Sequence, residues 1–135
     1  MLKRLTRKLL ILCALVVCLT MAVASTPAQG SGYQLSGKVY YWLMDVVDSP
    51  SVVIHKWDGS SWVYHGTAFG DSCGDYTYDT GGPGQFMGSV SGFYTVRDNM
   101  QFCGWNTSFA NVSGSNETEV SASNPSASLY IFTTG

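Results

Sequence analysis

Residues 51–69 have the sequence SVVIHKWDGSSWVYHGTAF. Two runs rich in β-branched and aromatic residues flank the pair Asp58-Gly59, and this arrangement is typical of a β-hairpin. Two registers are open at this point, because a two-residue turn sets Trp57 opposite Ser60 and a longer loop sets it opposite Trp62. A shift of one residue exchanges the two faces of a strand, so the register decides which aromatic rings are exposed.

Segments of similar character continue on both sides of this hairpin. Further strands are predicted at 33–44, 75–80, 85–96, 100–109, 117–123 and 127–133, with a polar loop at 111–116. In the first of these strands, Leu35 and Val39 share one face, as the alternation of strand residues requires. No segment has the apolar spacing of an amphipathic helix. Seven or eight short strands predict an all-β fold, an antiparallel β-sandwich of the immunoglobulin-like type.

The first 24 residues have the three parts of an export signal. A segment with four Lys and Arg residues precedes the apolar run 9–19, and Ala22-Val23-Ala24 matches the small-x-small pattern of signal peptidase. We expect cleavage after Ala24, with Ala28 as the alternative, a flexible segment over 25–32 and a single domain over 33–135. The apolar run is short for a bilayer core about 30 Å thick, so no membrane span is expected.

Removal of this signal changes the charge balance of the chain. The full sequence has 135 residues and a formal net charge of −2, but nine acidic and only three basic residues lie after Ala24. An acidic exported chain is a poor candidate for binding nucleic acid or anionic lipid. We expect free secretion, and the composition leaves the oligomeric state open.

Cys73 and Cys103 are the cysteines that lie outside the predicted signal. In an oxidising compartment, a pair of this kind most simply forms one disulfide. The alternative is a nucleophilic cysteine with a histidine partner, and no local sequence signature supports it. The sequence therefore predicts a Cys73–Cys103 disulfide.

A turn motif follows the hairpin. Residues 67–78 are TAFGDSCGDYTY, and the segment Pro83-Gly84-Gln85-Phe86 comes shortly after them. This stretch resembles the threonine-x-x-aspartate-x-x-glycine-x-tyrosine turn of the transthyretin-like, carboxypeptidase regulatory-domain-like modules. The turn glycine here is Gly74, and Tyr76 follows it at strand spacing. A proline-glycine before an aromatic residue is similar to the next strand of that family. The resemblance covers about residues 36–95 and implies an exported β-sandwich that serves as a non-catalytic appendage, stalk or binding domain.

Residue types that support catalysis or metal binding occur without the spacing that such sites require. His55 and His65 lie on the two arms of the hairpin, but their spacing matches no zinc motif. Asp71, Asp75 and Asp79 recur at every fourth position, whereas an EF-type calcium loop needs acids at alternate positions and a terminal Glu. No nucleophile elbow or zinc-protease motif is present. The prediction is a protein that is not an enzyme, with no catalytic residue, metal or cofactor.

Aromatic residues are the most informative functional feature of the chain. Its 4 Trp, 8 Tyr and 6 Phe residues exceed what a core of this size needs. The others are expected at the surface, where flat apolar rings stack on sugars or anchor protein partners. The expected binding residues are Trp57, Trp62, Tyr64, Trp42 and Trp105, the first two of them beside the hairpin turn.

These features favour a secreted, non-catalytic module that recognises an extracellular glycan or a protein. The alternative is a structural protein that self-associates through open edge strands, and a small hydrolase is the third hypothesis. Three Asn-x-Ser/Thr sequons, at Asn106, Asn111 and Asn116, are glycosylation sites only if the host is eukaryotic.

Overall fold

The computed structural model describes residues 30–42, 44–99 and 103–135, and within these ranges it contains nine strands and no helix. The strands are β1 (Gln34–Tyr41), β2 (Asp45–Val47), β3 (Ser51–Trp57), β4 (Trp62–Phe69), β5 (Asp75–Asp79), β6 (Gly84–Arg97), β7 (Thr107–Val120), β8 (Ser126–Ser128) and β9 (Ile131–Thr133). The all-β prediction is confirmed. The described residues include no helix that is long and apolar enough to cross a membrane. The predicted signal and its cleavage site near Ala24 lie outside the described residues.

Four predicted strands match observed ones to within one residue: 51–57, 61–69, 75–80 and 85–96. The loop predicted at 111–116 is wrong, because β7 crosses this stretch and pairs with β6 at every position. Pairing along β6 overrides the turn preference of Asn, Ser and Gly. The strand predicted at 127–133 is interrupted and forms β8 and β9, which raises the number of strands. Part of the strand predicted at 100–109 lies outside the described residues.

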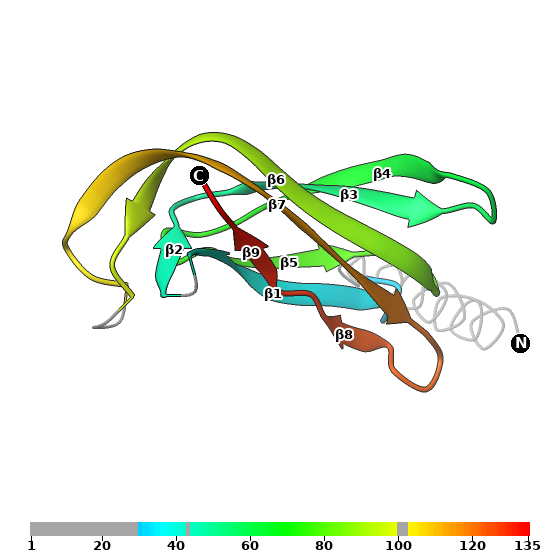
Figure 1. The fold of residues 1–135 in the computed structure, drawn as a ribbon. Coiled ribbons are helices and arrows are strands. Elements are labelled where there is room, and N and C mark those ends of the chain that lie inside the picture. The colour runs from blue at the N-terminus through cyan, green and yellow to red at the C-terminus, as the bar shows by residue number, and fades with distance from the viewer. Residues whose placement is uncertain (1–29, 43, 100–102) are drawn as a thin grey trace, which may run out of the picture.

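Figure 1 shows two layers of strands that face each other. One layer has the order β4-β3-β6-β7, and the other has the order β5-β1-β8. Most neighbouring strands are antiparallel, but β8 and β9 run parallel to β1. The predicted antiparallel sandwich is therefore confirmed in part, since the last two strands pair in parallel with the first.

A closed circuit of strands joins the two layers at one end. The end of β1 pairs with β2 on one side and with β9 on the other. β2 continues onto β6, and two hydrogen bonds between Ser113 and Thr134 join β7 to the residue after β9. Each strand of the circuit has a neighbour on both sides there, so no strand has an open edge at this end, whereas β4 and β5 remain edge strands.

The core lies between the two layers and is built from alternate residues of the strands. Leu35 and Val39 of β1 are fully buried, and so are Ile54 of β3 and Phe86 of β6. The face predicted for Leu35 and Val39 is therefore confirmed. Burial of each side chain of this size stabilises the fold by about 1.5–3 kcal/mol, which makes this cluster the main source of stability.

Gly37 of β1 lies where two backbones approach closely. A Cβ atom at this position would overlap the carbonyl oxygen of Leu129, in the connection between β8 and β9. The same carbonyl accepts a hydrogen bond of 2.5 Å from the hydroxyl of buried Tyr76. Burial raises the pKa of Tyr76, so its hydroxyl keeps the proton that it donates. Glycine is required at position 37 because any side chain would separate β1 from this connection.

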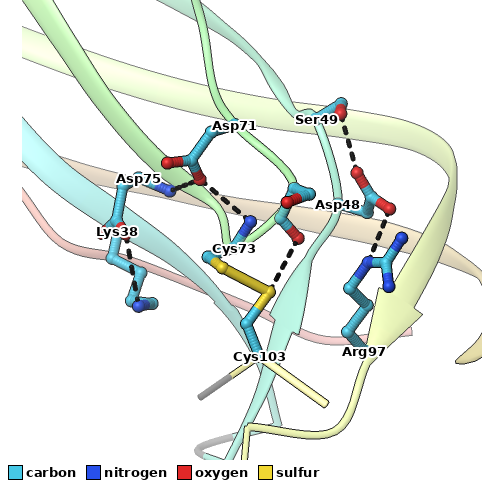
Figure 2. The surroundings of a disulfide bond; sticks show 9 residues. Lys38, Asp48, Ser49, Asp71, Cys73, Asp75, Arg97 and Cys103 are labelled. Atoms are coloured by element: carbon cyan, nitrogen blue, oxygen red, sulfur yellow. Dashed lines mark hydrogen bonds and ion pairs between the residues drawn. A yellow bond between two sulfur atoms is a disulfide. The ribbon is translucent and has the colours of Figure 1, made fainter. Parts of the chain in front are cut away.

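The predicted disulfide between Cys73 and Cys103 is confirmed, and it joins the β4–β5 turn to the β6–β7 connection (Figure 2). Oδ1 of Asp71 accepts the backbone N–H groups of Cys73 at 2.9 Å and Asp75 at 3.0 Å. These two hydrogen bonds hold the turn in the shape that presents Cys73. The disulfide thus connects two segments that no strand pairing brings together.

Gly37→Ala should destabilise the fold by about 1–3 kcal/mol, because the added methyl group forces β1 away from Leu129. Gly82→Ala is the matched control, since a Cβ at Gly82 meets no atom within 4 Å and its φ is not positive. Urea unfolding followed by tryptophan fluorescence measures both variants. Equal stability of the two would show that Gly37 is not a packing constraint.

The double variant Cys73→Ser/Cys103→Ser should lower the free energy of unfolding by roughly 3–4 kcal/mol, because the bond closes a long loop in the unfolded chain. Dithiothreitol should destabilise the wild type by a similar amount and leave the double variant unchanged. The measurement is the urea midpoint with and without reductant, with complete reduction checked by mass spectrometry. A fully reduced wild type with an unchanged midpoint would contradict the prediction.

Candidate functional site

Asp58 holds together the four-residue loop at the tip of the β3–β4 hairpin. Its Oδ1 accepts the backbone N–H groups of Ser60 and Ser61, both at 2.8 Å. These hydrogen bonds lower the pKa of Asp58, so the carboxylate that caps the loop stays ionised. Trp57 and Trp62 are paired across the strands, and the longer of the two predicted loops is the one adopted.

Trp57, Trp62 and Tyr64 lie on the outer face of the hairpin. His55 and Trp57 of β3 alternate with buried Ile54, and residues paired across the two strands share a face. The ring centroids of Trp57 and Trp62 are 5.3 Å apart, with the ring planes inclined by 61°. His55 pairs with Tyr64 across the strands, and their rings meet edge to face at 6.2 Å. Tyr64 is 63% exposed and Trp57 36%. We call these four side chains the hairpin cluster.

A β-bulge turns His65 to the opposite face of the hairpin. The register shifts here, so His65 has no partner of its own on β3. Its Nδ1 lies 2.6 Å from the hydroxyl of Tyr78 on β5, and its ring packs edge-on against the core residue Phe86. Partial burial and the charge of Lys56 lower the pKa of His65. His55 and His65 therefore point away from each other and share no site.

An open depression of about 610 Å³ lies at the hairpin tip. Its lining combines apolar and polar side chains: Lys56, Trp57, Asp58, Val63, Tyr64 and His65. Aromatic faces beside a few hydrogen-bonding groups are the composition of a small-ligand site. The depression can therefore accept a ligand that has both apolar faces and polar edges.

Trp42 and Trp105 belong to the predicted binding residues, but the structure sets them apart from the hairpin cluster. Trp42 follows β1, packs edge-on against Tyr41 and donates its backbone N–H to Thr133. Trp105 is 97% exposed and follows the end of β6, whereas the hairpin tip lies beside the start of β6. Both rings are exposed, yet neither adds to the surface that Trp57, Trp62 and Tyr64 form.

The three aspartates that recur at every fourth position each have a structural partner. Asp71 accepts backbone N–H groups of its own turn. Asp75 pairs with Lys38 at 3.5 Å, and Asp79 accepts the hydroxyl of Ser31 at 2.6 Å. These contacts account for the three residues without a bound cation. Within residues 30–42, 44–99 and 103–135, no group of three or more His, Cys, Asp or Glu side chains could hold a metal.

Further exposed rings were not predicted from the sequence: Phe69, Phe93, Phe109, Tyr130 and Phe132. Phe93 and Phe109 stack across β6 and β7 with their centroids 5.8 Å apart. On the outer face of the other layer, Tyr40 stacks on Phe132 at 5.1 Å. If residues 111–116 had been predicted as a strand that continues from Phe109, the alternation with Val112 would have placed Phe109 on the outer face.

Acidification should destabilise the protein through His65. Because its pKa is lowered from 6.5, neutral His65 contributes stability above that value, which is lost as the pH falls through the lowered pKa. The melting temperature of the wild type should therefore fall more between about pH 7 and about pH 5 than that of His65→Gln. Equal falls in the two proteins would show that protonation of His65 is not linked to unfolding.

Comparisons with known proteins give a distant structural likeness. No family model and no curated protein matches the sequence. The chain is similar to a crystal structure of (S)-allantoin synthase, with a TM-score of 0.43 and 9% sequence identity over 78% of this chain. It spans only 42% of that protein's chain. A likeness at this level carries no argument about activity, and the resemblance to transthyretin-like modules stays a prediction.

Proposed function

We propose that this protein is a secreted, non-catalytic module that binds an extracellular carbohydrate through Trp57, Trp62 and Tyr64. The observation that carries the proposal is the position of these rings on one outward face, beside the open depression. An aromatic side chain has only two rotatable bonds, so it loses little conformational entropy when a ligand covers it. The capped loop at Asp58 holds both strands that present the rings.

The exposed ring surface is large enough to hold a sugar. Aromatic side chains bury roughly 150–250 Å² each, so the exposed parts of the hairpin cluster amount to a few hundred Å². At about 25 cal/mol per Å², covering on the order of 200 Å² contributes about 5 kcal/mol before the cost of association. A millimolar complex corresponds to about 4 kcal/mol, so the cluster suits a weak, reversible glycan contact.

The size of the cluster favours a carbohydrate over a protein partner. A stable protein interface buries about 800 Å² on each partner, several times the surface that these rings offer. Sugar rings present apolar C–H faces that stack on aromatic planes such as those of Trp57 and Tyr64. A monosaccharide or disaccharide therefore matches both the area and the chemistry of the hairpin tip.

Export is supported by two features of the chain. The disulfide between Cys73 and Cys103 is of the kind that persists in oxidising compartments. The predicted signal over 1–24 gives the chain a route to such a compartment. A glycan on a cell surface or in an extracellular matrix is accessible to a protein delivered in this way.

Self-association through strand edges, the alternative from the sequence, has less support along β7. Thr134 covers the edge at Ser113 with two hydrogen bonds. Asn116 accepts the N–H of Glu117 with its own Oδ1 and donates its Nδ2 to the carbonyl of Tyr130. A covered edge with charged residues is a common protection against edge pairing.

The double variant Trp57→Ala/Trp62→Ala should lose carbohydrate binding, because it removes the paired rings of the hairpin cluster. Wild type and variant are compared on a glycan array and in pull-downs with insoluble polysaccharides. Trp105→Ala is the matched control, since it removes an exposed ring of the same type at the other end of β6. This control should bind like the wild type.

Three outcomes would contradict this assignment. Wild-type binding by a folded double variant would exclude the hairpin cluster as the site. Loss of binding in Trp105→Ala alone would move the site to the β6–β7 connection. A wild type that binds no carbohydrate in either assay would overturn the proposed function. Melting temperatures of the variants show that any loss does not come from unfolding.

A further inference from the structure

We propose that the hairpin cluster is one end of a longer binding face whose other end is formed by Phe93 and Phe109. The ligand of this face is an extended, neutral glycan chain that lies along β6 and β7. The inference rests on the proposed function and adds the class of ligand, a polymer bound along its length.

The register of the four-stranded layer places the two ends on a common face. One row of outward side chains crosses β4, β3, β6 and β7 in turn: Tyr64, His55, Met87 and Glu117. Alternate residues of a strand point to the same side, so Phe93 shares the face of Met87. Phe109 of β7 pairs with Thr95 of β6, so it lies on this same side, where its ring stacks on that of Phe93.

The distance between the two ends suits several sugar rings. The ladder between β6 and β7 has no register shift, so the alternation is not interrupted between Met87 and Phe93. The six residues from one to the other span ~20 Å of strand at ~3.3 Å per residue. A ligand that touches both ends is therefore longer than a disaccharide.

Small hydroxyl side chains cover the face between the aromatic ends. Two adjacent cross-strand pairs supply them, Ser89↔Ser115 and Ser91↔Ser113. Serine side chains are shorter than the rings at either end, so they form the floor between two taller aromatic groups. Each hydroxyl donates one hydrogen bond and accepts others, which matches the edges of sugar rings. Within the described part of the chain, none of the four hydroxyls takes part in another hydrogen bond.

The charges on this face favour a neutral polymer. Glu117 and Glu119 of β7 point to the same side as the serines. The ion pairs among the described residues include neither of them, whereas Arg97, the base on this face, is paired with Asp48 at 2.7 Å. The unpaired carboxylates along β7 would repel an anionic polysaccharide or a nucleic acid, whereas a neutral glycan has no charge for them to repel.

The test compares short and long ligands on the full secreted protein. Cellobiose and cellohexaose are titrated calorimetrically, together with the disaccharides and hexasaccharides of xylan and mannan. In at least one series, the wild type should bind the hexasaccharide about tenfold more tightly than the disaccharide. Phe93→Ser/Phe109→Ser should remove this gain and leave the affinity for the disaccharide unchanged.

Phe132→Ser is the matched control, because it removes a half-exposed phenylalanine from the outer face of the other layer. It should keep the full preference for the hexasaccharide. Trp57→Ala/Trp62→Ala should lose the affinity for both ligands, since the hairpin cluster holds the first sugar rings. Because Phe93, Phe109 and Phe132 are exposed, the variants at these three positions should keep melting temperatures close to that of the wild type.

The outcomes separate this inference from the proposed function. Unchanged hexasaccharide binding by Phe93→Ser/Phe109→Ser overturns the extended face and leaves the hairpin site intact. No binding of any oligosaccharide by the wild type overturns both. Sedimentation velocity tests a third outcome. If the wild type is a dimer and Phe93→Ser/Phe109→Ser is a monomer, the two rings belong to an interface between copies of the chain. That result would overturn the inference.

Discussion

The contact between β1 and the C-terminal segment is the constraint on which the rest of the structure depends. Gly37 lets the backbone at Leu129 approach β1, and Tyr76 bonds the same carbonyl from β5. This contact places β8 and β9 beside the first strand, completes the second layer and closes the circuit through β2, β6 and β7. Bringing together the two ends of the chain costs loop-closure entropy, and the disulfide offsets part of that cost by restricting the unfolded chain.

The same arrangement leaves the outer face of the four-stranded layer without a covering layer. The second layer covers the inner face of β3 and β6, where Ile54 and Phe86 are buried. Nothing in the described part of the chain covers their outer face, and Figure 1 shows the tip of the β3–β4 hairpin clear of β5. The aromatic residues are divided accordingly, with Tyr76 and Phe86 in the core and the hairpin cluster outside. The aromatic residues that the core does not need therefore lie on the outer faces of the two layers.

Local signals in the sequence predicted what depends on neighbouring residues. Strong β-formers around Asp58-Gly59 identified the β3–β4 hairpin, and a pair of cysteines outside the predicted export signal identified the disulfide. The stretch from Asn111 to Asn116 was mistaken for a loop, because its strand conformation comes from pairing with β6 and not from its own propensity. Three of the five predicted binding residues come together in the hairpin cluster. Trp42 and Trp105 do not, because composition marks a ring as surplus without giving its position.

By itself, the sequence determined the all-β class, the hairpin, the disulfide pairing and the excess of aromatic side chains over the needs of the core. Each of these follows from short-range spacing or from counts of residue types. Only the tertiary structure decided the longer register that pairs Trp57 with Trp62, the parallel strands β8 and β9, and the shared outer face of Tyr64 and Phe93. The physical reason is that these features depend on pairing between segments distant in sequence. Such pairing is selected by the burial of the whole core, which no local pattern encodes.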